Sequence, residues 1–177
     1  GTIMQFAMSS DQGNTFSTIS FNDEPRGLGS DITTDRNGVV YHFWPATQAR
    51  EIRMNRSTDG GASFTPSIVV ADTNAGFIFP LPSIEVRDAF IYVAADTDNS
   101  GGPFDGRIYA AWTDTTATDN DNDAQANHAR IVVAHSTDGG ATWQQTIPHE
   151  TADELTVDRW HQWLKVGPDG TVHVAYY

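Results

Sequence analysis

The chain has 177 residues, 38% of them hydrophobic and 11% aromatic, which is enough for a folded core. Its net charge of −13 disfavours contact with phosphate backbones, so nucleic acid is not an expected partner. No apolar run reaches the roughly 20 residues that cross a membrane, and the absence of cysteine excludes disulfides and thiolate metal sites. Eighteen of the 23 acidic residues are Asp, which favours tight turns and predicts an all-β protein.

Taken in chain order, the most informative feature is a turn motif that occurs three times, at residues 9–16, 57–64 and 136–143. The copies read SSDQGNTF, STDGGASF and STDGGATW. The Asp of such a turn accepts hydrogen bonds from backbone N–H groups further along, the Gly permits a positive φ, and the aromatic residue begins the next strand with its ring packed on the sheet. The residues expected in these structural roles are Asp11, Gly13, Phe16, Asp59, Gly61, Phe64, Asp138, Gly140 and Trp143.

Alternating strand patterns flank each copy of the motif. A second type of hairpin turns at Asn37-Gly38 and at Asp169-Gly170, which are strong signals for tight turns. Between these hairpins, residues 90–95 and 107–112 read as strands joined by a longer loop. The order predicts four-stranded meanders: half a unit at 1–23, whole units at 30–71 and 82–147, and half a unit at 160–177.

The turn motif is similar to the Asp-box, also called the bacterial neuraminidase repeat. Through these three copies and the run at residues 106–114, the chain resembles the sialidase-like superfamily of β-propellers. The resemblance implies a propeller of the six-bladed type, of which this chain carries about three blades' worth of strands. The rest of the ring would then come from the same longer chain or from another chain. In that family the boxes are structural and lie away from the active site.

The resemblance also implies a function. It points to a carbohydrate-active protein of a bacterium, secreted or on the cell surface, that acts on a glycan or glycoconjugate as an exo-sialidase or related glycoside hydrolase. Sialidases use a Tyr nucleophile, and no motif here places that Tyr, its Glu partner, the Asp acid/base or the first-blade arginine-isoleucine-proline sequence. The alternative is a non-catalytic propeller that binds glycan or protein. A purely structural repeat module is a third hypothesis.

Candidate substrate-binding residues lie in the connections from a fourth strand to the next first strand, which share one face. The connections at 22–29, 72–88 and 149–162 each carry an arginine: Arg26, Arg87 and Arg159, the last followed by Trp160. A guanidinium fork suits the carboxylate of an acidic sugar, and a ring can stack on a sugar face. The alternative is that each arginine pairs with a nearby carboxylate, namely Glu24, Asp88 and Asp158.

A metal site is a separate hypothesis. The turn at 96–102 has oxygen-bearing side chains at its first, third and fifth positions and Gly at the sixth, as at the start of a calcium loop. The ligands would be Asp96, Asp98 and Ser100, with Asp105 closing the site. The run with Asp119, Asp121 and Asp123 shows the same alternation without a Gly. No cofactor is required by the sequence, calcium is the only one suggested, and polar turns are the alternative.

Overall fold

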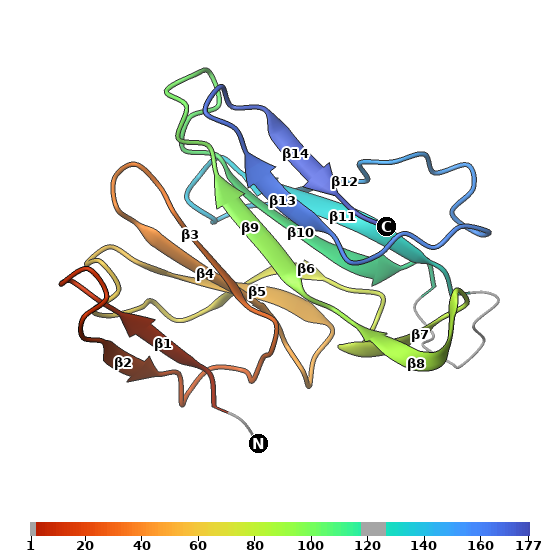
Figure 1. Cartoon of the computed structure of the whole chain (residues 1–177), viewed down its shortest axis with the longest axis horizontal. Coiled ribbons are helices and arrows are strands. Elements are labelled where there is room, and N and C mark those ends of the chain that lie inside the picture. Colours follow the sequence, from red (N-terminus) through yellow and green to blue (C-terminus); the bar gives the residue numbers. More distant parts are fainter. Residues whose placement is uncertain (1–2, 118–126) are drawn as a thin grey trace.

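The computed structural model describes residues 3–117 and 127–177, apart from the side chain of Glu85. Within this part of the chain there is no helix, so the prediction of an all-β protein is confirmed and no long apolar helix crosses a membrane there. The strands form two four-stranded and three two-stranded antiparallel sheets, none of them closed on itself (Figure 1).

Both four-stranded sheets are simple meanders in which each strand pairs with the next one in sequence. The first sheet contains β3 (Asp31–Thr34), β4 (Val40–Pro45), β5 (Glu51–Ser57) and β6 (Ile68–Asp72). The second contains β9 (Val93–Thr97), β10 (Ile108–Thr115), β11 (Ala129–Ser136) and β12 (Gln144–Thr146). Antiparallel neighbours joined by short turns need no crossover, which is why the pattern could be read from the sequence.

Three hairpins accompany these sheets. One is β1 (Gln5–Met8) with β2 (Ser17–Ser20), and another is β13 (Trp163–Val166) with β14 (Val172–Ala175). The third, β7 (Ile78–Leu81) with β8 (Ile84–Phe90), forms a sheet of its own inside the connection between the two four-stranded sheets. The sequence did not predict this hairpin: it placed residues 82–90 in the second meander, whose first strand instead begins at Val93.

The main core lies between the two four-stranded sheets. It joins Phe43, Ile52 and Met54 of the first sheet to Ile108 and Trp112 of the second, all of them almost fully buried. Every residue of β4 and of β10 is buried, because both are inner strands of sheets covered on two faces. Continuous apolar character, rather than alternation, is what such positions require.

The first strands of successive sheets lie side by side, with β9 between β3 and β13 (Figure 1). Carboxylates join them across the seams. The backbone N–H of Ala95 donates to Asp31 at 2.9 Å, and that of Val166 donates to Asp96 at 3.0 Å. The hydroxyls of Thr33 and Thr97, 2.7 Å apart, add a bond across the first seam. Acidic side chains therefore link neighbouring sheets as well as forming turns.

Each of the three predicted turns connects the last two strands of its unit, as expected. In the central copy, Asp59 accepts hydrogen bonds from Ser57 Oγ at 2.6 Å, from the Ser63 N–H at 2.9 Å and from Ser63 Oγ at 2.6 Å. Equivalent bonds occur in the other two copies. These bonds, the one from Ser57 first, lower the pKa of Asp59 to about 2. We call the segments 9–16, 57–64 and 136–143 the aspartate turns.

Two of the three predicted glycines of these turns also make close contacts, whereas Gly13 has open space beside it. Gly61 and Gly140 have φ of 94° and 92°, which only glycine adopts without strain. A Cβ on Gly61 would lie 2.7 Å from the ring of Phe6, and one on Gly140 would lie 2.4 Å from Met54. Each of these turns therefore packs against the preceding sheet.

The expectation that the turn aromatics are at least partly buried is correct for two of three. The ring of Phe64 packs edge-on against Phe6 at 4.8 Å, and that of Trp143 against Phe43 at 5.8 Å. Phe16 is 63% exposed, so the expectation is wrong for the first copy. The physical reason is that Phe64 and Trp143 pack on a preceding sheet, whereas no described residue occupies the corresponding place beside Phe16.

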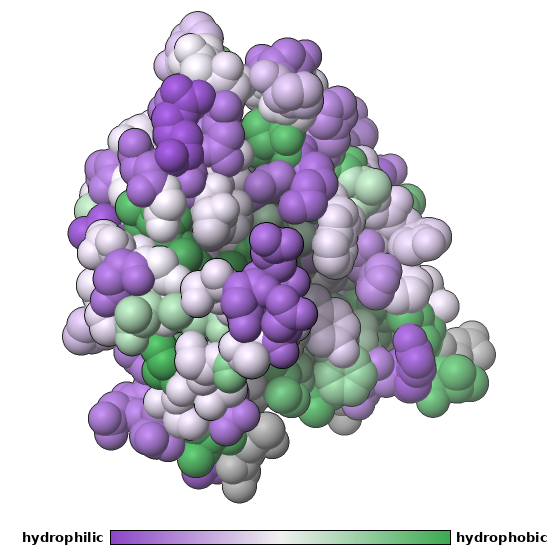
Figure 2. All heavy atoms as spheres, turned by 60° about the vertical axis from the view of Figure 1, so that its left-hand side comes forward, coloured by the Kyte–Doolittle hydropathy of each residue, from purple (hydrophilic) through white to green (hydrophobic). Residues whose placement is uncertain are grey.

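One face of the molecule is largely hydrophilic. Figure 2 shows the side of the molecule on which β1 and β2 come forward, where hydrophobic residues appear in small separate groups among polar ones. Such a distribution is ordinary for the surface of a folded protein. On this face, functional candidates are therefore sought in cavities rather than in one large apolar patch.

Candidate functional site

The two ends of the sheets differ. Short turns, including the aspartate turns, lie at one end, whereas the hairpin β7–β8 and the connections at 21–30, 46–50 and 147–162 lie at the other (Figure 1). All the predicted substrate-binding residues belong to this second end. Long connections carried by a rigid scaffold are where binding residues usually occur.

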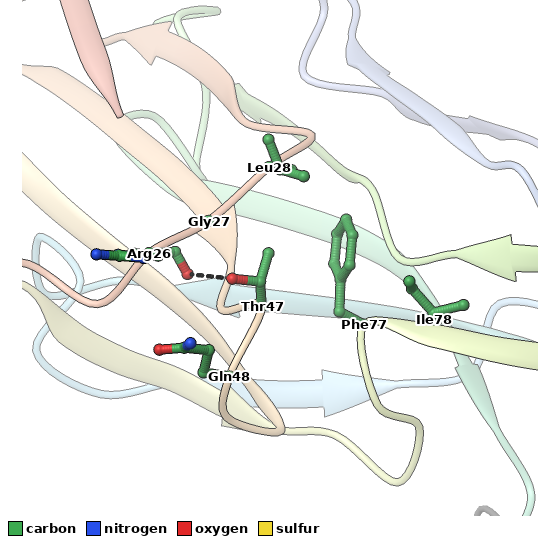
Figure 3. A pocket seen from close by; sticks show the side chains of 7 residues that line it. All are labelled: Arg26, Gly27, Leu28, Thr47, Gln48, Phe77 and Ile78. Atoms are coloured by element: carbon green, nitrogen blue, oxygen red, sulfur yellow. Dashed lines mark hydrogen bonds between the residues drawn. The ribbon is translucent and has the colours of Figure 1, made fainter. Parts of the chain in front are cut away.

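Arg26 lines a cavity of about 500 Å³ at this end (Figure 3). Its backbone is fixed, because its carbonyl accepts hydrogen bonds from the Thr47 N–H at 2.8 Å and from Thr47 Oγ1 at 3.2 Å. The next residue, Gly27, lies flat on the ring of Trp44, since an added Cβ would be 2.2 Å from a ring carbon. In the view of Figure 3, the side chain of Arg26 extends away from Phe77.

A second cavity, of about 260 Å³, brings Arg87 and Trp160 together. Arg87 comes from β8 and Trp160 from the connection before β13, so 73 residues of sequence separate them. In the part of the chain that the structure describes, Arg87 has no ion pair with a carboxylate. The cavity is lined by further aromatic or polar side chains, among them Phe90, Tyr92, Thr113 and His161. We call it the Arg87 pocket.

Gln162, which is 6% exposed, links residues that line the Arg87 pocket. Its Nε2 donates to the carbonyls of Tyr92 at 2.9 Å and Ala111 at 3.0 Å, and its Oε1 accepts from Thr113 Oγ1 at 2.8 Å. All the side-chain hydrogen-bonding groups of Gln162 are therefore used. Gln162 joins the first two strands of the second sheet to the connection that carries Trp160.

Local contacts fix two further residues of the pocket, Tyr92 and His161. A Cβ on Gly29 would lie 2.0 Å from the Tyr92 ring, so the first connection packs directly on that ring. His161 has a φ of 56°, which is unusual for a residue other than glycine. Its N–H donates to Thr113 Oγ1 at 3.1 Å, and its ring lies 5.9 Å from Trp160 and 6.1 Å from Tyr177. Backbone strain of this kind persists only where the surroundings enforce it.

Buried carboxylates anchor the connections around the pocket. Asp114, at the end of β10, accepts from the N–H groups of Asn74 at 3.1 Å and Ala75 at 2.9 Å. Burial raises the pKa of Asp114, and these backbone bonds act in the opposite direction. Asp158 accepts from the Ser83 N–H at 2.9 Å, which ties the hairpin β7–β8 to the last connection.

The structure does not bring the three predicted arginines to one pocket. Arg159 is 13% exposed and forms a 2.9 Å ion pair with Asp153, rather than with Asp158 as the alternative proposed. This hydrogen bond lowers the pKa of Asp153 and raises that of Arg159. Arg26 and Arg87 line different cavities and form no ion pair with any described carboxylate. Of the four predicted substrate-binding residues, only Arg87 and Trp160 share a cavity.

The two cavities lie next to each other through their aromatic walls. The ring of Phe77, in the Arg26 cavity, is 5.8 Å from that of Phe90, in the Arg87 pocket. Phe90 in turn stacks with Tyr92 at 6.3 Å. This end of the molecule therefore carries a continuous aromatic strip with an arginine beside each cavity.

Of the predicted calcium ligands, Asp98 and Ser100 lie together, whereas Asp96 and Asp105 have partners in neighbouring sheets. Asp96 faces β13, where it accepts from Val166, whereas Asp105 forms a 2.9 Å ion pair with Arg36 from the neighbouring sheet. Arg36 also donates to the carbonyl of Asn99 at 2.9 Å, so a guanidinium takes up oxygens of this turn. Asp98 accepts from the Ser100 N–H at 2.8 Å. No cluster of three potential metal-binding side chains occurs among the described residues. Asp119, Asp121 and Asp123 lie outside the described residues.

Three residues of this site were not predicted from the sequence: Gln162, Thr113 and Tyr92. A buried glutamine leaves no signal in a pattern of hydrophobicity, and its role depends on carbonyls from two other strands. Tyr92 could have been noticed as an aromatic residue directly before a predicted strand. Only the fold shows that the Tyr92 ring lies beside Arg87 and Trp160.

Comparison with known proteins adds structural relatives. No protein-family model and no curated protein sequence matches the chain. Among solved structures, it is similar to the NanB sialidase from Streptococcus pneumoniae, with a TM-score of 0.58 and 14% identity over 98% of this chain and 24% of that one. It is also similar to the intramolecular trans-sialidase from Ruminococcus gnavus, with a TM-score of 0.57 and 16% identity over 97% of this chain and 33% of that one.

The similarity to these two sialidases concerns the fold alone. The chain spans about a quarter to a third of the length of the two sialidases, and the identities are low. Similarity at this level carries over the arrangement of strands and not the activity. The chain therefore has a sialidase-like β-sheet fold, matching part of each of these two enzymes.

Proposed function

We propose that the chain is part of a β-propeller of the sialidase-like, six-bladed type. The sheets β3–β6 and β9–β12 are two complete blades, and the hairpins β1–β2 and β13–β14 are half-blades. Support comes from the meander topology, from the similarity to sialidases, and from the aspartate turns, which we identify with Asp-boxes. The same longer chain or another chain supplies the remaining blades.

The proposed function is recognition of an acidic sugar of a glycan or glycoconjugate by the Arg87 pocket. The observation that carries it is an arginine without a described carboxylate partner in one cavity with Trp160, Tyr92 and His161. A guanidinium gives paired, charge-assisted hydrogen bonds to a carboxylate, and the rings provide faces for a pyranose. In an acidic protein, such an arginine is a local positive site for an anionic ligand.

Hydrolysis of that sugar is the activity that similarity to sialidases suggests, and a non-catalytic glycan-binding propeller is the alternative. The described pocket offers groups that bind, so binding is the function proposed for this part of the chain. A secreted or cell-surface location in a bacterium fits such a ligand. Two of the similar sialidases come from bacteria.

The test is calorimetric titration with the methyl α-glycoside of N-acetylneuraminic acid. We expect the free acid to bind more tightly than its methyl ester, because esterification removes the charge that Arg87 contacts. Arg87→Ala should weaken binding of the acid about tenfold or more, as for loss of a charge-assisted hydrogen bond. Equal binding of acid and ester, or unchanged binding by Arg87→Ala, would contradict the proposal.

Arg26→Ala is the matched control, since it removes an exposed arginine from the neighbouring cavity. We expect it to change the affinity less than threefold, in the range of ordinary surface electrostatics. Turnover of a fluorogenic sialoside is a separate measurement. Turnover that is lost in Arg87→Ala favours the enzyme, and binding without turnover favours the non-catalytic propeller.

A further inference from the structure

One residue of the Arg87 pocket has a backbone conformation that residues with side chains normally avoid. Among the described residues other than glycine, Gln12 and His161 have a positive φ, of 62° and 56°. Gln12 lies in the first aspartate turn, where the other two copies have Gly60 and Gly139, so the turn itself accounts for its conformation. His161 belongs to no such turn, and it lines a cavity. Its conformation costs free energy, so the surrounding structure must impose it.

Hydrogen bonds on both sides hold the backbone of His161. Its N–H donates to Thr113 Oγ1 at 3.1 Å, and that hydroxyl donates to Oε1 of the buried Gln162 at 2.8 Å. The preceding residue, Trp160, is paired in both directions with Tyr177, with a distance of 3.0 Å in each N–H···O=C bond. Both neighbours of His161 are therefore fixed. Backbone strain that is enforced in this way is concentrated at sites that hold a ligand.

The imidazole of His161 is available to a ligand. The residue is exposed, and its ring makes no hydrogen bond to the part of the chain that the structure describes. The ring contacts are with Trp160 at 5.9 Å and with Tyr177 at 6.1 Å. His161 lines the Arg87 pocket and also a cavity of about 100 Å³ that adjoins it. An imidazole supported by rings in this position can hydrogen-bond to a bound molecule.

The charge of His161 matters because few other charges line the pocket. Arg87 and Asp88, both from β8, line it with opposite charges. The phenols of Tyr92 and Tyr177 are the other titratable groups described beside the ring. Histidine is the side chain that ordinarily changes its charge between pH 5 and 8. An imidazolium at His161 gives the described lining of the pocket a net positive charge.

The carboxylates on the connection that carries His161 already have partners. Asp153 is paired with Arg159 at 2.9 Å. Asp158 lies 3.2 Å from Nδ1 of His128 and accepts from two backbone N–H groups, each at 2.9 Å. These carboxylates are therefore held by other groups, so an anionic ligand is the partner that an imidazolium at His161 lacks.

We propose that His161 is a second recognition group of the Arg87 pocket and strengthens the binding of an acidic sugar in mild acid. The imidazolium donates a charge-assisted hydrogen bond to the sugar carboxylate that Arg87 also contacts. Binding of the acid therefore takes up a proton, whereas binding of the uncharged methyl ester does not. The inference rests on the proposed function of this pocket.

The test is calorimetric titration with the methyl α-glycoside of N-acetylneuraminic acid at pH 8, 6.5 and 5.5, in two buffers of different ionisation enthalpy. We expect the acid to bind about tenfold more tightly at pH 5.5 than at pH 8, as for one added charge-assisted hydrogen bond. The heat at pH 6.5 should depend on the buffer, because protons are taken up. The methyl ester should bind equally at the three pH values, with no dependence on the buffer.

His161→Gly removes the imidazole and accepts the positive φ without strain. We expect it to fold with a melting temperature no lower than that of the wild type, and to bind the acid equally at pH 8 and pH 5.5. Gln12→Gly is the matched control, because it relieves the same conformation in the first aspartate turn. It should keep the tenfold increase in affinity. An increase that is kept in His161→Gly overturns the proposal.

The outcomes separate this inference from the proposed function. If the wild type prefers the acid to the ester equally at all three pH values and takes up no proton, the role of His161 is wrong and the proposed function stands. If the wild type does not bind the acid at any of these pH values, both are wrong. If His161→Gly does not fold, the proton uptake of the wild type and of Gln12→Gly decides the question.

Discussion

His42 shows at the scale of one residue how burial sets chemistry. It is 3% exposed, between the rings of Phe21 and Trp44, with Asn55 beside it. Burial lowers its pKa from 6.5 to about 4, and the contact with Asn55 opposes this only in part. No charged side chain contacts the ring among the described residues. The sequence does not indicate this environment, because Phe21 comes from the connection after β2 and Asn55 from β5.

The lowered pKa of His42 predicts a specific loss of stability in mild acid. Between pH 6.5 and 4 the unfolded chain binds a proton at His42 that the folded chain does not, so the free energy of unfolding decreases as the pH falls through this range. A shift of this size corresponds to about 3 kcal/mol. Urea unfolding at several pH values should show a shallower decrease for His42→Phe than for the wild type.

His173→Phe is the control for that experiment, since it makes the same chemical change on an exposed position of β14. It should keep the wild-type slope between pH 6.5 and 4. A slope in His42→Phe equal to that of the wild type would show that another group governs the transition.

Residue-level prediction from sequence succeeded where roles are local. The Asp, Gly and hydroxyl positions of the aspartate turns follow from bonds within eight residues, and the structure has these bonds. It did not succeed for Gln162, whose three partners lie 49 to 70 residues away. The partner of Arg159 was predicted only in part. The sequence indicated a nearby carboxylate, but both Asp153 and Asp158 are near, and only the path of the connection selects Asp153.

At the scale of elements, the aspartate turns close the outer hairpins. We expect Asp59→Asn to lower the melting temperature near pH 7, because the amide cannot accept all the bonds that the carboxylate accepts. The folded pKa of about 2 lies below the ordinary value of 3.8. The contribution of the ionised carboxylate is therefore fully present above about pH 4 and is lost as the pH falls toward 2. The difference between variant and wild type should shrink over that range.

Asp88→Asn serves as the comparison, because it removes one charge from an exposed aspartate at the opposite end of the molecule. Its melting temperature should follow the wild type at each pH. A constant difference between Asp59→Asn and wild type from pH 7 to pH 2 would argue that the turn depends on shape rather than on ionisation.

The strands were predicted less well where proline residues interrupt the pattern and where the hairpin β7–β8 is inserted between the two four-stranded sheets. The hairpin β7–β8 was not predicted because Pro80 and Pro82 interrupt the strand pattern and lack an N–H to donate. Its register also shifts between Phe79 and Leu81, which blurs the alternation. The hairpins with Asn-Gly and Asp-Gly turns were predicted well, since those dipeptides fix the turn type directly.

At the scale of the whole molecule, the excess of aspartate has a structural explanation. Asp31, Asp96, Asp114 and Asp158 each accept a backbone N–H from a different sheet or connection. Edges of neighbouring sheets carry N–H groups that need acceptors, and short carboxylates reach them without a long flexible stem. Composition pointed to turns alone, because links between sheets become visible only once the sheets are placed beside each other.

Asp96 links β9 to β13 across the seam between their sheets. Asp96 accepts from the N–H groups of Val166 and Thr97, both at 3.0 Å, and lies 3.5 Å from Lys165. Asp96→Asn keeps the size but turns an acceptor into a donor facing an N–H, so it should lower the free energy of unfolding by about 2 kcal/mol. Asp72→Asn, which removes the same charge from an exposed position in β6, should change it by less than about 0.5 kcal/mol. Urea denaturation of the wild type and the two variants measures these free energies of unfolding. Equal stabilities of Asp96→Asn and Asp72→Asn would mean that the loss of charge, and not the loss of the bond across the seam, lowers the stability. Faster hydrogen exchange confined to β13 and β14 in Asp96→Asn would place the loss at this seam.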